Sequence, residues 1–167
     1  DYIQLSPGTE YENKVAHYNL GYCYFNTQRW GDAAASFHKF LSVYPTRDNL
    51  RADAYNRLGD AAFAQRDYRE AVNNYDQAIR LNAPATDYAQ FQRAVMLGLL
   101  DQRDRKIESL RDIISSGKGD YVDDAMYELG RTYVQTERFN DGAAVLKRLT
   151  ATYPESPYYL PALSQLG

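Results

Sequence analysis

The sequence has a single cysteine, Cys23, among its 167 residues, so an internal disulfide and a cysteine-rich metal site are both excluded. It has only two histidines, and no His or Cys spacing matches that of a metal site. No apolar run reaches the roughly 18–20 residues that span a bilayer. The first ten residues have no basic start followed by an apolar stretch. The sequence therefore predicts no metal, no direct membrane insertion and no visible targeting segment.

The sequence also lacks a strong charge of either sign and any recognisable catalytic motif. Nineteen Lys and Arg residues stand against 22 Asp and Glu, a net charge of −3, so no basic field indicates a nucleic-acid partner. Nothing pairs two carboxylates as a general acid and base, and GKGD at 117–120 lacks phosphate-loop spacing. His17 and Cys23 are both interpreted as packing residues of one helix. We therefore expect a protein that is not an enzyme and has no cofactor.

Tyrosine is abundant, with 16 residues against 10 glycines, and a repeat accounts for many of these rings. A Leu-Gly pair recurs in HYNLGYCYF (17–25), YNRLGDAAF (55–63) and MYELGRTYV (126–134). Ala94 occupies the glycine column in a fourth, degenerate copy. From one anchor to the next, at Gly21, Gly59, Ala94 and Gly130, the spacings are 38, 35 and 36 residues. Such periods indicate helical repeats.

Each copy is predicted to form two antiparallel amphipathic helices. In the second copy, apolar residues at helical spacing are interrupted at 65–67 and then resume, which predicts a tight turn between two helices. Small residues at Gly59 and Ala71 allow the two backbones to approach closely. Prolines 45, 84 and 154 and Gly117 end the second helices.

The sequence resembles the tetratricopeptide repeat family in four features. These are the Leu-Gly pair, the turn aromatics Trp30, Tyr68 and Phe139, the small residue after the turn and the closing proline. The third copy departs from the pattern at Arg93 and Lys106 and has no closing proline. The resemblance implies an all-α fold, a right-handed superhelical array (an α-solenoid) of antiparallel helix hairpins. The predicted repeats are 11–47, 48–85, 86–119 and 120–156, with the end of a preceding repeat at 1–10 and the start of a further one at 157–167.

The resemblance further implies that a ligand lies along a concave groove formed by the first helix of each hairpin. First-helix side chains not used by the Leu-Gly columns are predicted to face it, the aromatic ones as a floor and the charged ones as polar specificity groups. These candidate binding residues are Tyr18, Tyr22, Phe25, Asp53, Asn56, Asp60, Phe63, Tyr88, Phe91, Asp124, Tyr127 and Arg131. For Phe25, Phe63 and Phe91, sealing one repeat against the next is an equal alternative.

The function expected from this arrangement is a non-enzymatic scaffold that binds a peptide or helix of a partner protein. A self-associating structural array and a glycan-binding element are alternatives, the latter because Tyr, Asp and Asn also suit sugars. The Tyr-Pro repeat ends are similar to those of bacterial envelope proteins. That similarity implies a periplasmic or outer-membrane-associated role in a bacterium, with a cytoplasmic location as the alternative.

Overall fold

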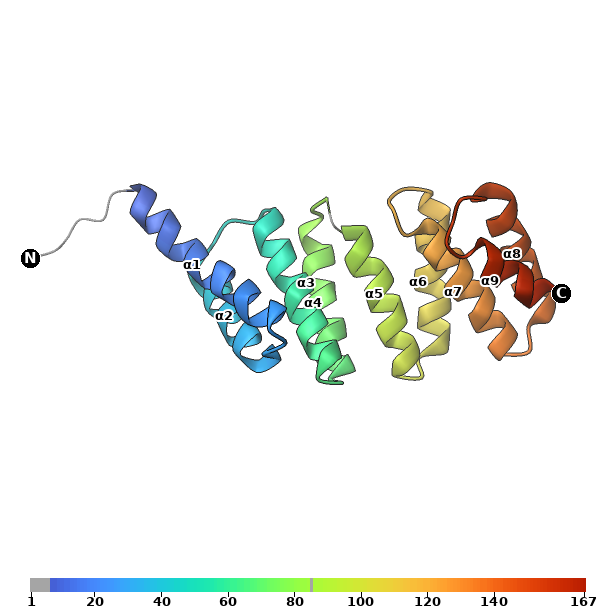
Figure 1. Ribbon diagram of the computed structural model, residues 1–167, viewed down its shortest axis with the longest axis horizontal. Coiled ribbons are helices and arrows are strands. Elements are labelled where there is room, and N and C mark those ends of the chain that lie inside the picture. Colours follow the sequence, from blue (N-terminus) through green and yellow to red (C-terminus); the bar gives the residue numbers. More distant parts are fainter. Residues whose placement is uncertain (1–6, 85) are drawn as a thin grey trace, which may run out of the picture. The chain divides into compact units, whose positions relative to one another are not determined.

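The computed structural model describes residues 7–84 and 86–167, and within them it contains only helices (Figure 1). The nine helices in this part are α1 (Pro7–Asn26), α2 (Trp30–Val43), α3 (Asn49–Ala64), α4 (Tyr68–Leu81), α5 (Thr86–Leu99), α6 (Arg103–Ser116), α7 (Val122–Gln135), α8 (Phe139–Thr152) and α9 (Tyr159–Leu166). The predicted all-α helical repeat array is confirmed. The chain divides into two compact units, residues 1–89 and 90–167.

Eight of these helices form consecutive pairs, α1 with α2, α3 with α4, α5 with α6 and α7 with α8, and α9 follows the last pair. α1 begins at Pro7, so residues 7–10, which we expected to end a preceding repeat, continue into the first helix. Residues 1–6 of that expected segment lie outside the described residues. α3 is two residues longer than α4 and is capped by Asp48, whose side chain accepts a hydrogen bond from the Arg51 amide.

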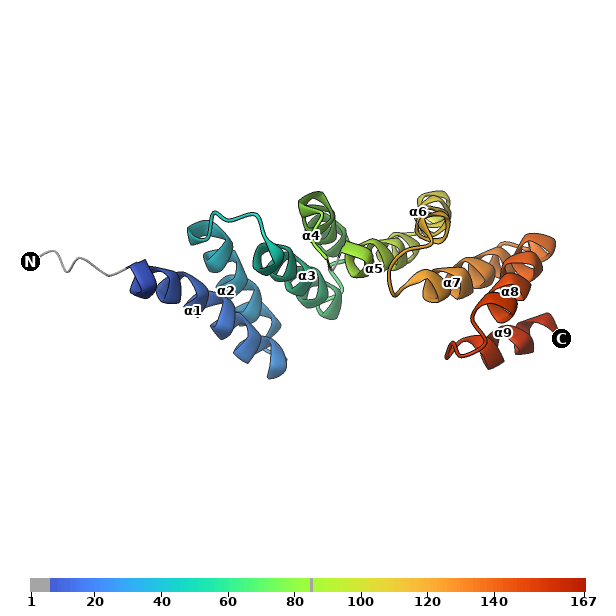
Figure 2. The same cartoon turned by 90° about the horizontal axis from the view of Figure 1, so that it is seen from above.

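Close helix packing within each hairpin depends on the glycine columns. Each of three glycines faces the large side chain 16 residues later. A Cβ atom added to the glycine would lie within 2.8 Å of that side chain in the pairs Gly21–Phe37, Gly59–Tyr75 and Gly130–Leu146. Gly142 is also closely packed, because a Cβ there would lie 3.1 Å from the carbonyl oxygen of Gly130. The small columns thus let the backbones approach, as the sequence predicts. Figure 2 shows α7 and α8 as one such hairpin.

A left-handed residue makes the turn inside every hairpin. Gln28, Arg66, Asp101 and Glu137 have φ between 57° and 62°, although none is glycine. In each case the amide of the next residue donates a hydrogen bond to the carbonyl five residues before it, for example Asp67 N to Ala62 O at 2.9 Å. This is the helix-ending geometry that usually employs glycine. Gly117, as predicted, ends α6 in the same conformation with φ 61°.

The third repeat forms two regular helices despite its atypical residues. Lys106, at the position of a small residue in the other copies, is only 7% exposed, and its aliphatic chain packs against Gly98. Its ammonium group donates a 2.6 Å hydrogen bond to Oε1 of Glu128 on α7, and Oε2 of Glu128 lies 3.3 Å from Arg131. The buried charge is therefore compensated by a partner on the next repeat.

Candidate functional site

Tyrosine hydroxyl groups of the first unit gather around two aspartates of α3. Tyr18 and Tyr22, one turn apart on α1, both donate hydrogen bonds to Oδ2 of Asp53, at 2.7 Å from Tyr18. Their rings meet edge to face with centroids 5.1 Å apart. The contact ties α1 to α3, the first helices of two consecutive repeats.

Asp60, two turns further along α3, makes a second junction of the same kind. Its Oδ1 accepts hydrogen bonds from Tyr75 of α4, at 2.7 Å, and from Tyr88 of α5, at 2.6 Å. Its Oδ2 lies 2.7 Å from Nη1 of Arg57. Both oxygens of Asp60 are therefore occupied by groups of the chain itself.

Arg57 lies between these two aspartates and completes the cluster. Its Nε is 3.6 Å from Asp53, and its guanidinium carbon is 5.5 Å from the ring centroids of both Phe25 and Tyr88. Burial lowers the pKa of Arg57, but the charges of Asp60 and Asp53 outweigh burial and raise it. We call Tyr18, Tyr22, Asp53, Arg57, Asp60, Tyr75 and Tyr88 the tyrosine–aspartate cluster.

The cluster holds its hydroxyl groups in the protonated form. Burial raises the pKa of Tyr22 to about 12, and the hydrogen bond to Asp53 acts in the same direction. Burial also raises the pKa of Tyr75, together with the charge of Asp60. Two carboxylates against one guanidinium leave a formal charge of −1, so the cluster is a nearly neutral, internally bonded surface.

The structure changes the roles that the sequence predicts for Asp53, Asp60 and Asn56 of α3. Asp53 and Asp60 were expected to recognise polar groups of a partner, but tyrosine hydroxyls and Arg57 already occupy them. Asn56 is only 1% exposed, so it is a packing residue. It follows Ala52 by four residues and precedes Gly59 by three, on the buried stripe of α3. Its Oδ1 has no hydrogen-bond partner among the described residues.

Aromatic side chains provide the surface of the first unit that a partner could contact. Phe63 is 46% exposed and lies 6.2 Å from the ring of Tyr68. Phe25 is partly buried and packs edge to face on Trp30 with centroids 5.1 Å apart. Tyr18, Tyr22 and Tyr88 are also partly buried, so each keeps some exposed surface. A partner would meet rings here and few free polar atoms.

The second unit carries a smaller patch, formed by Asp124, Tyr127 and Arg131 of α7 and by Tyr158, which precedes α9. Tyr127 stacks on Tyr158 with centroids 4.7 Å apart, and the Arg131 guanidinium lies 5.8 Å from the Tyr127 centroid. Tyr158 donates a 2.6 Å hydrogen bond to Asp124, whose pKa is raised by burial against the opposing effect of that bond. Phe91 instead stacks on Tyr121, with ring centroids 5.5 Å apart.

Sequence reasoning missed Arg57 and Tyr158. Arg57 follows Asp53 by four residues and precedes Asp60 by three, the spacing at which helix side chains of opposite charge meet, so its role could have been inferred. Tyr158 precedes α9, and no periodic pattern points from it to Tyr127.

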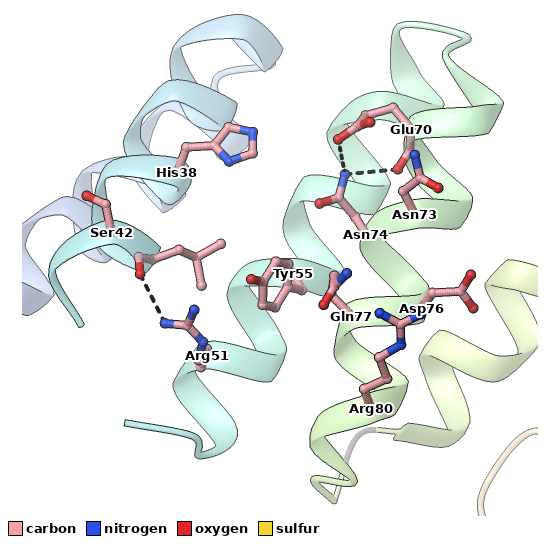
Figure 3. Close-up of a pocket in the computed structure, with 11 residues that line it drawn as sticks. His38, Ser42, Arg51, Tyr55, Glu70, Asn73, Asn74, Asp76, Gln77 and Arg80 are labelled. Carbon is pink, nitrogen blue, oxygen red and sulfur yellow. Dashed lines mark hydrogen bonds between the residues drawn. The ribbon is translucent and has the colours of Figure 1, made fainter. Parts of the chain in front are cut away.

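A cleft of about 650 Å³ lies between α2 and α4 of the first unit, with α3 beneath it (Figure 3). Arg51 on α3 donates hydrogen bonds to the carbonyl groups of Leu41 and Tyr44 at the end of α2. Asn74 donates to Glu70 of its own helix. Side-chain amides, Tyr55 and charged groups dominate the lining, so this cleft is polar (Figure 3).

Groups that could support metal or covalent chemistry are sparse. Across residues 7–84 and 86–167, no cluster of three His, Cys, Asp or Glu side chains could hold a metal ion. Cys23, interpreted from the sequence as a buried packing residue, is exposed. In the same ranges, no helix has both the length and the apolar character needed to cross a bilayer.

The fold and the glycine columns define a helical-hairpin repeat protein. Matches to the tetratricopeptide repeat family cover residues 14–82 and 124–156. The chain belongs to the tetratricopeptide repeat family, whose members are generally non-enzymatic scaffolds for protein–protein interaction. No curated protein matches the sequence.

Several solved structures share the fold at low sequence identity. The structure of YrrB, described as a TPR protein with an unusual peptide-binding site, is 21% identical with a TM-score of 0.72, over 90% of this chain and 74% of YrrB. MamA is 22% identical with a TM-score of 0.73, over 91% of this chain and 79% of MamA. A tetratricopeptide repeat protein of Parabacteroides merdae is 16% identical with a TM-score of 0.77, over 95% of this chain and 59% of that protein. At these identities the likeness concerns the fold alone.

Proposed function

We propose that the protein is a scaffold that holds a peptide or helix of a partner protein in a concave groove formed by the first helices of its repeats. The observation that carries the proposal is the partly exposed aromatic surface of Tyr22, Phe63 and Tyr127 on those helices. The polar groups beside these rings are largely bonded within the chain. Rigid rings provide large contact area at low entropic cost, which suits an apolar peptide face.

The proposed partner contributes apolar side chains more than charge. The tyrosine–aspartate cluster has a formal charge of −1 and offers few free donors or acceptors. An amphipathic helix with its apolar face toward the rings, or an extended apolar segment, meets these requirements. The peptide-binding site noted for YrrB is consistent with a peptide ligand, although that structure shares only the fold.

Alanine substitutions at exposed rings test the proposal. Peptides selected from a displayed library of random dodecamers would be titrated against wild type, Phe63→Ala and Tyr127→Ala. Phe139→Ala is the matched control, because Phe139 is 60% exposed yet begins a second helix. We expect the groove variants to weaken binding about tenfold and the control to leave it unchanged. Equal affinity of all four proteins would refute the groove.

The two alternative functions yield different results in simple experiments. Self-association predicts a sedimentation coefficient that rises with protein concentration over the micromolar range. Glycan binding predicts that oligosaccharides on an array are retained while the selected peptides are not, and that Tyr22→Ala reduces the retention. Neither alternative has a supporting observation beyond the ring-rich surface itself.

The cellular compartment belongs to the same proposal. The similarity of the Tyr-Pro repeat ends to bacterial envelope proteins suggests a role in envelope assembly, in the periplasm or at the outer membrane. Cell fractionation with an antibody against the protein tests this suggestion. Recovery of the protein in the cytoplasm alone would reject it.

A further inference from the structure

A second cleft lies in the second unit, between α6 and α8 with α7 beneath it. Its volume is about 390 Å³. The floor consists of Ile114, Met126 and Leu129, which are almost completely buried. Val145 of α8 is partly buried and lines one wall. The centre of this cleft is therefore apolar and able to receive one aliphatic side chain.

Two arginines stand on opposite walls of this cleft, Arg111 on α6 and Arg148 on α8. Both are exposed, and neither has a carboxylate partner within ion-pair distance in the described part of the chain. Asp141, the acidic residue of the lining, is already bound by Arg138 at 2.6 Å. The face of Tyr133 supports the Arg111 guanidinium, 5.8 Å from its centroid. The cleft thus presents two cationic groups, and among the described residues neither lies within ion-pair distance of a carboxylate.

The corresponding cleft of the first unit shows that this chemistry is not a general consequence of the fold. At the positions of Met126, Val145 and Arg148, counted from the glycine columns, that cleft has Tyr55, Asn74 and Gln77 (Figure 3). Figure 3 shows amide groups where the second unit has aliphatic and cationic ones. The two clefts share a position in the repeat and differ in what they can bind.

We propose that the cleft between α6 and α8 binds an extended segment of a partner protein in which an aliphatic residue is flanked by acidic residues. The aliphatic side chain enters the apolar floor, and the acidic side chains pair with Arg111 and Arg148 on the two walls. From Asp141 to Arg148 the α8 wall is about 10 Å long, at ~1.5 Å per helical residue. That length matches about three extended residues at ~3.3 Å each. This interaction is separate from the groove proposed above.

Fluorescence anisotropy with a defined probe tests the proposal. The probe is a fluorescein-labelled, C-terminally amidated peptide, Gly-Ser-Asp-Leu-Asp-Ser-Gly, titrated with the whole chain at physiological ionic strength. Three comparison peptides are used. In the first, Asn replaces both Asp residues, and in the second, Ala replaces Leu. The third ends in Leu, and its free terminal carboxylate is the only acidic group of the peptide sequence. We expect the probe to bind in the micromolar range and each comparison peptide to bind at least fivefold more weakly.

Protein variants assign the binding to this cleft. Arg148→Gln and Arg111→Gln are each expected to weaken binding about threefold to fivefold, which is typical of exposed ion pairs. Val145→Asp, which adds a negative charge to the wall, is expected to abolish it. Lys147→Gln is the matched control, because Lys147 is the exposed cationic neighbour of Arg148 and does not line the cleft. Circular dichroism melting shows that each variant is folded.

Several results would overturn the proposal. These are a probe that does not saturate at millimolar protein, equal binding of the Asn peptide, or arginine variants that bind like wild type. Tighter binding of the peptide with a free terminal carboxylate would assign the cleft to chain ends instead. Complete displacement of the probe by millimolar inorganic phosphate, with equal binding of the Ala peptide, would reduce the cleft to a general anion site.

Discussion

Replacing Gly59 by alanine is expected to destabilise the first unit by about 2 kcal/mol. The new Cβ would lie 2.5 Å from Cε1 of Tyr75, far closer than an ordinary van der Waals contact. The Tyr75 ring is 1% exposed, and its hydroxyl group is bonded to Asp60 at 2.7 Å, so it cannot move aside freely. Overpacking of this kind costs about 1–3 kcal/mol, and the better helix propensity of alanine returns up to about 1 kcal/mol. Loss of the hydroxyl bond adds to the cost.

Thermal and urea unfolding, followed by circular dichroism, measure this effect. A loss of about 2 kcal/mol corresponds to a fall in Tm of roughly 4–8 °C for a chain of this size. Gly31→Ala is the matched control, since Gly31 is also helical and an added Cβ meets nothing within 4 Å. We expect this control to be neutral or slightly stabilising.

A double variant tests the physical reason itself. In the third repeat the chain combines Ala94 with Leu110 at the corresponding positions, and both are fully buried. Gly59→Ala together with Tyr75→Leu should therefore cost at least about 1 kcal/mol less than the sum of the single changes. Additive effects, or a Gly59→Ala variant as stable as Gly31→Ala, would refute the reasoning.

Three further predictions concern charge, pH and backbone strain. Glu128→Gln leaves the buried Lys106 ammonium without a carboxylate, so it should lower the free energy of unfolding, measured in urea, by about 2–3 kcal/mol. The double variant Lys106→Met, Glu128→Gln should recover most of that lost stability. The free energy of unfolding should fall as the pH rises from about 10 to 12. The reason is that tyrosines of the unfolded chain ionise near pH 10, whereas the pKa of Tyr22 is raised to about 12 in the folded protein. Equal urea midpoints at pH 9 and pH 11 would contradict this prediction. Arg66→Gly, at φ 62°, should stabilise the protein by roughly 0.5 kcal/mol, while Arg69→Gly in the first turn of α4 should destabilise it by up to about 1 kcal/mol. The same sign for both would be inconsistent with strain at the turn.

The repeats could be predicted from the sequence because each depends on a steric requirement that few residues satisfy. Gly59 and Ala71 must be small for the helices of a hairpin to pack, and the same requirement marks the other copies. Lys106 breaks the pattern without breaking the helix, because a long side chain can lie along Gly98 and place its charge beside Glu128. That compensation involves the next repeat, so the sequence of a single repeat does not reveal it.

The candidate binding face could be predicted only in part. Periodicity placed Tyr18, Tyr22 and Asp53 on first helices, yet it gave no sign that the hydroxyl groups would bond to the carboxylate. That outcome depends on the distance between α1 and α3, which residue spacing within one helix does not determine. Asn56 was misassigned for a local reason, since its spacing from Gly59 places it on the buried stripe.

The internal bonding of the tyrosine–aspartate cluster has a consequence for ionic strength. Salt screens the attraction between exposed charges over a Debye length of about 8 Å at 0.15 M, but it does not weaken the burial of apolar rings. Because Asp53 and Asp60 are bonded within the chain, a ligand held on this face should keep its affinity as salt is added. A ligand held by Arg111 and Arg148, which have no ion-pair partner among the described residues, should be released. A salt titration can therefore tell on which surface of the protein a newly found partner is bound.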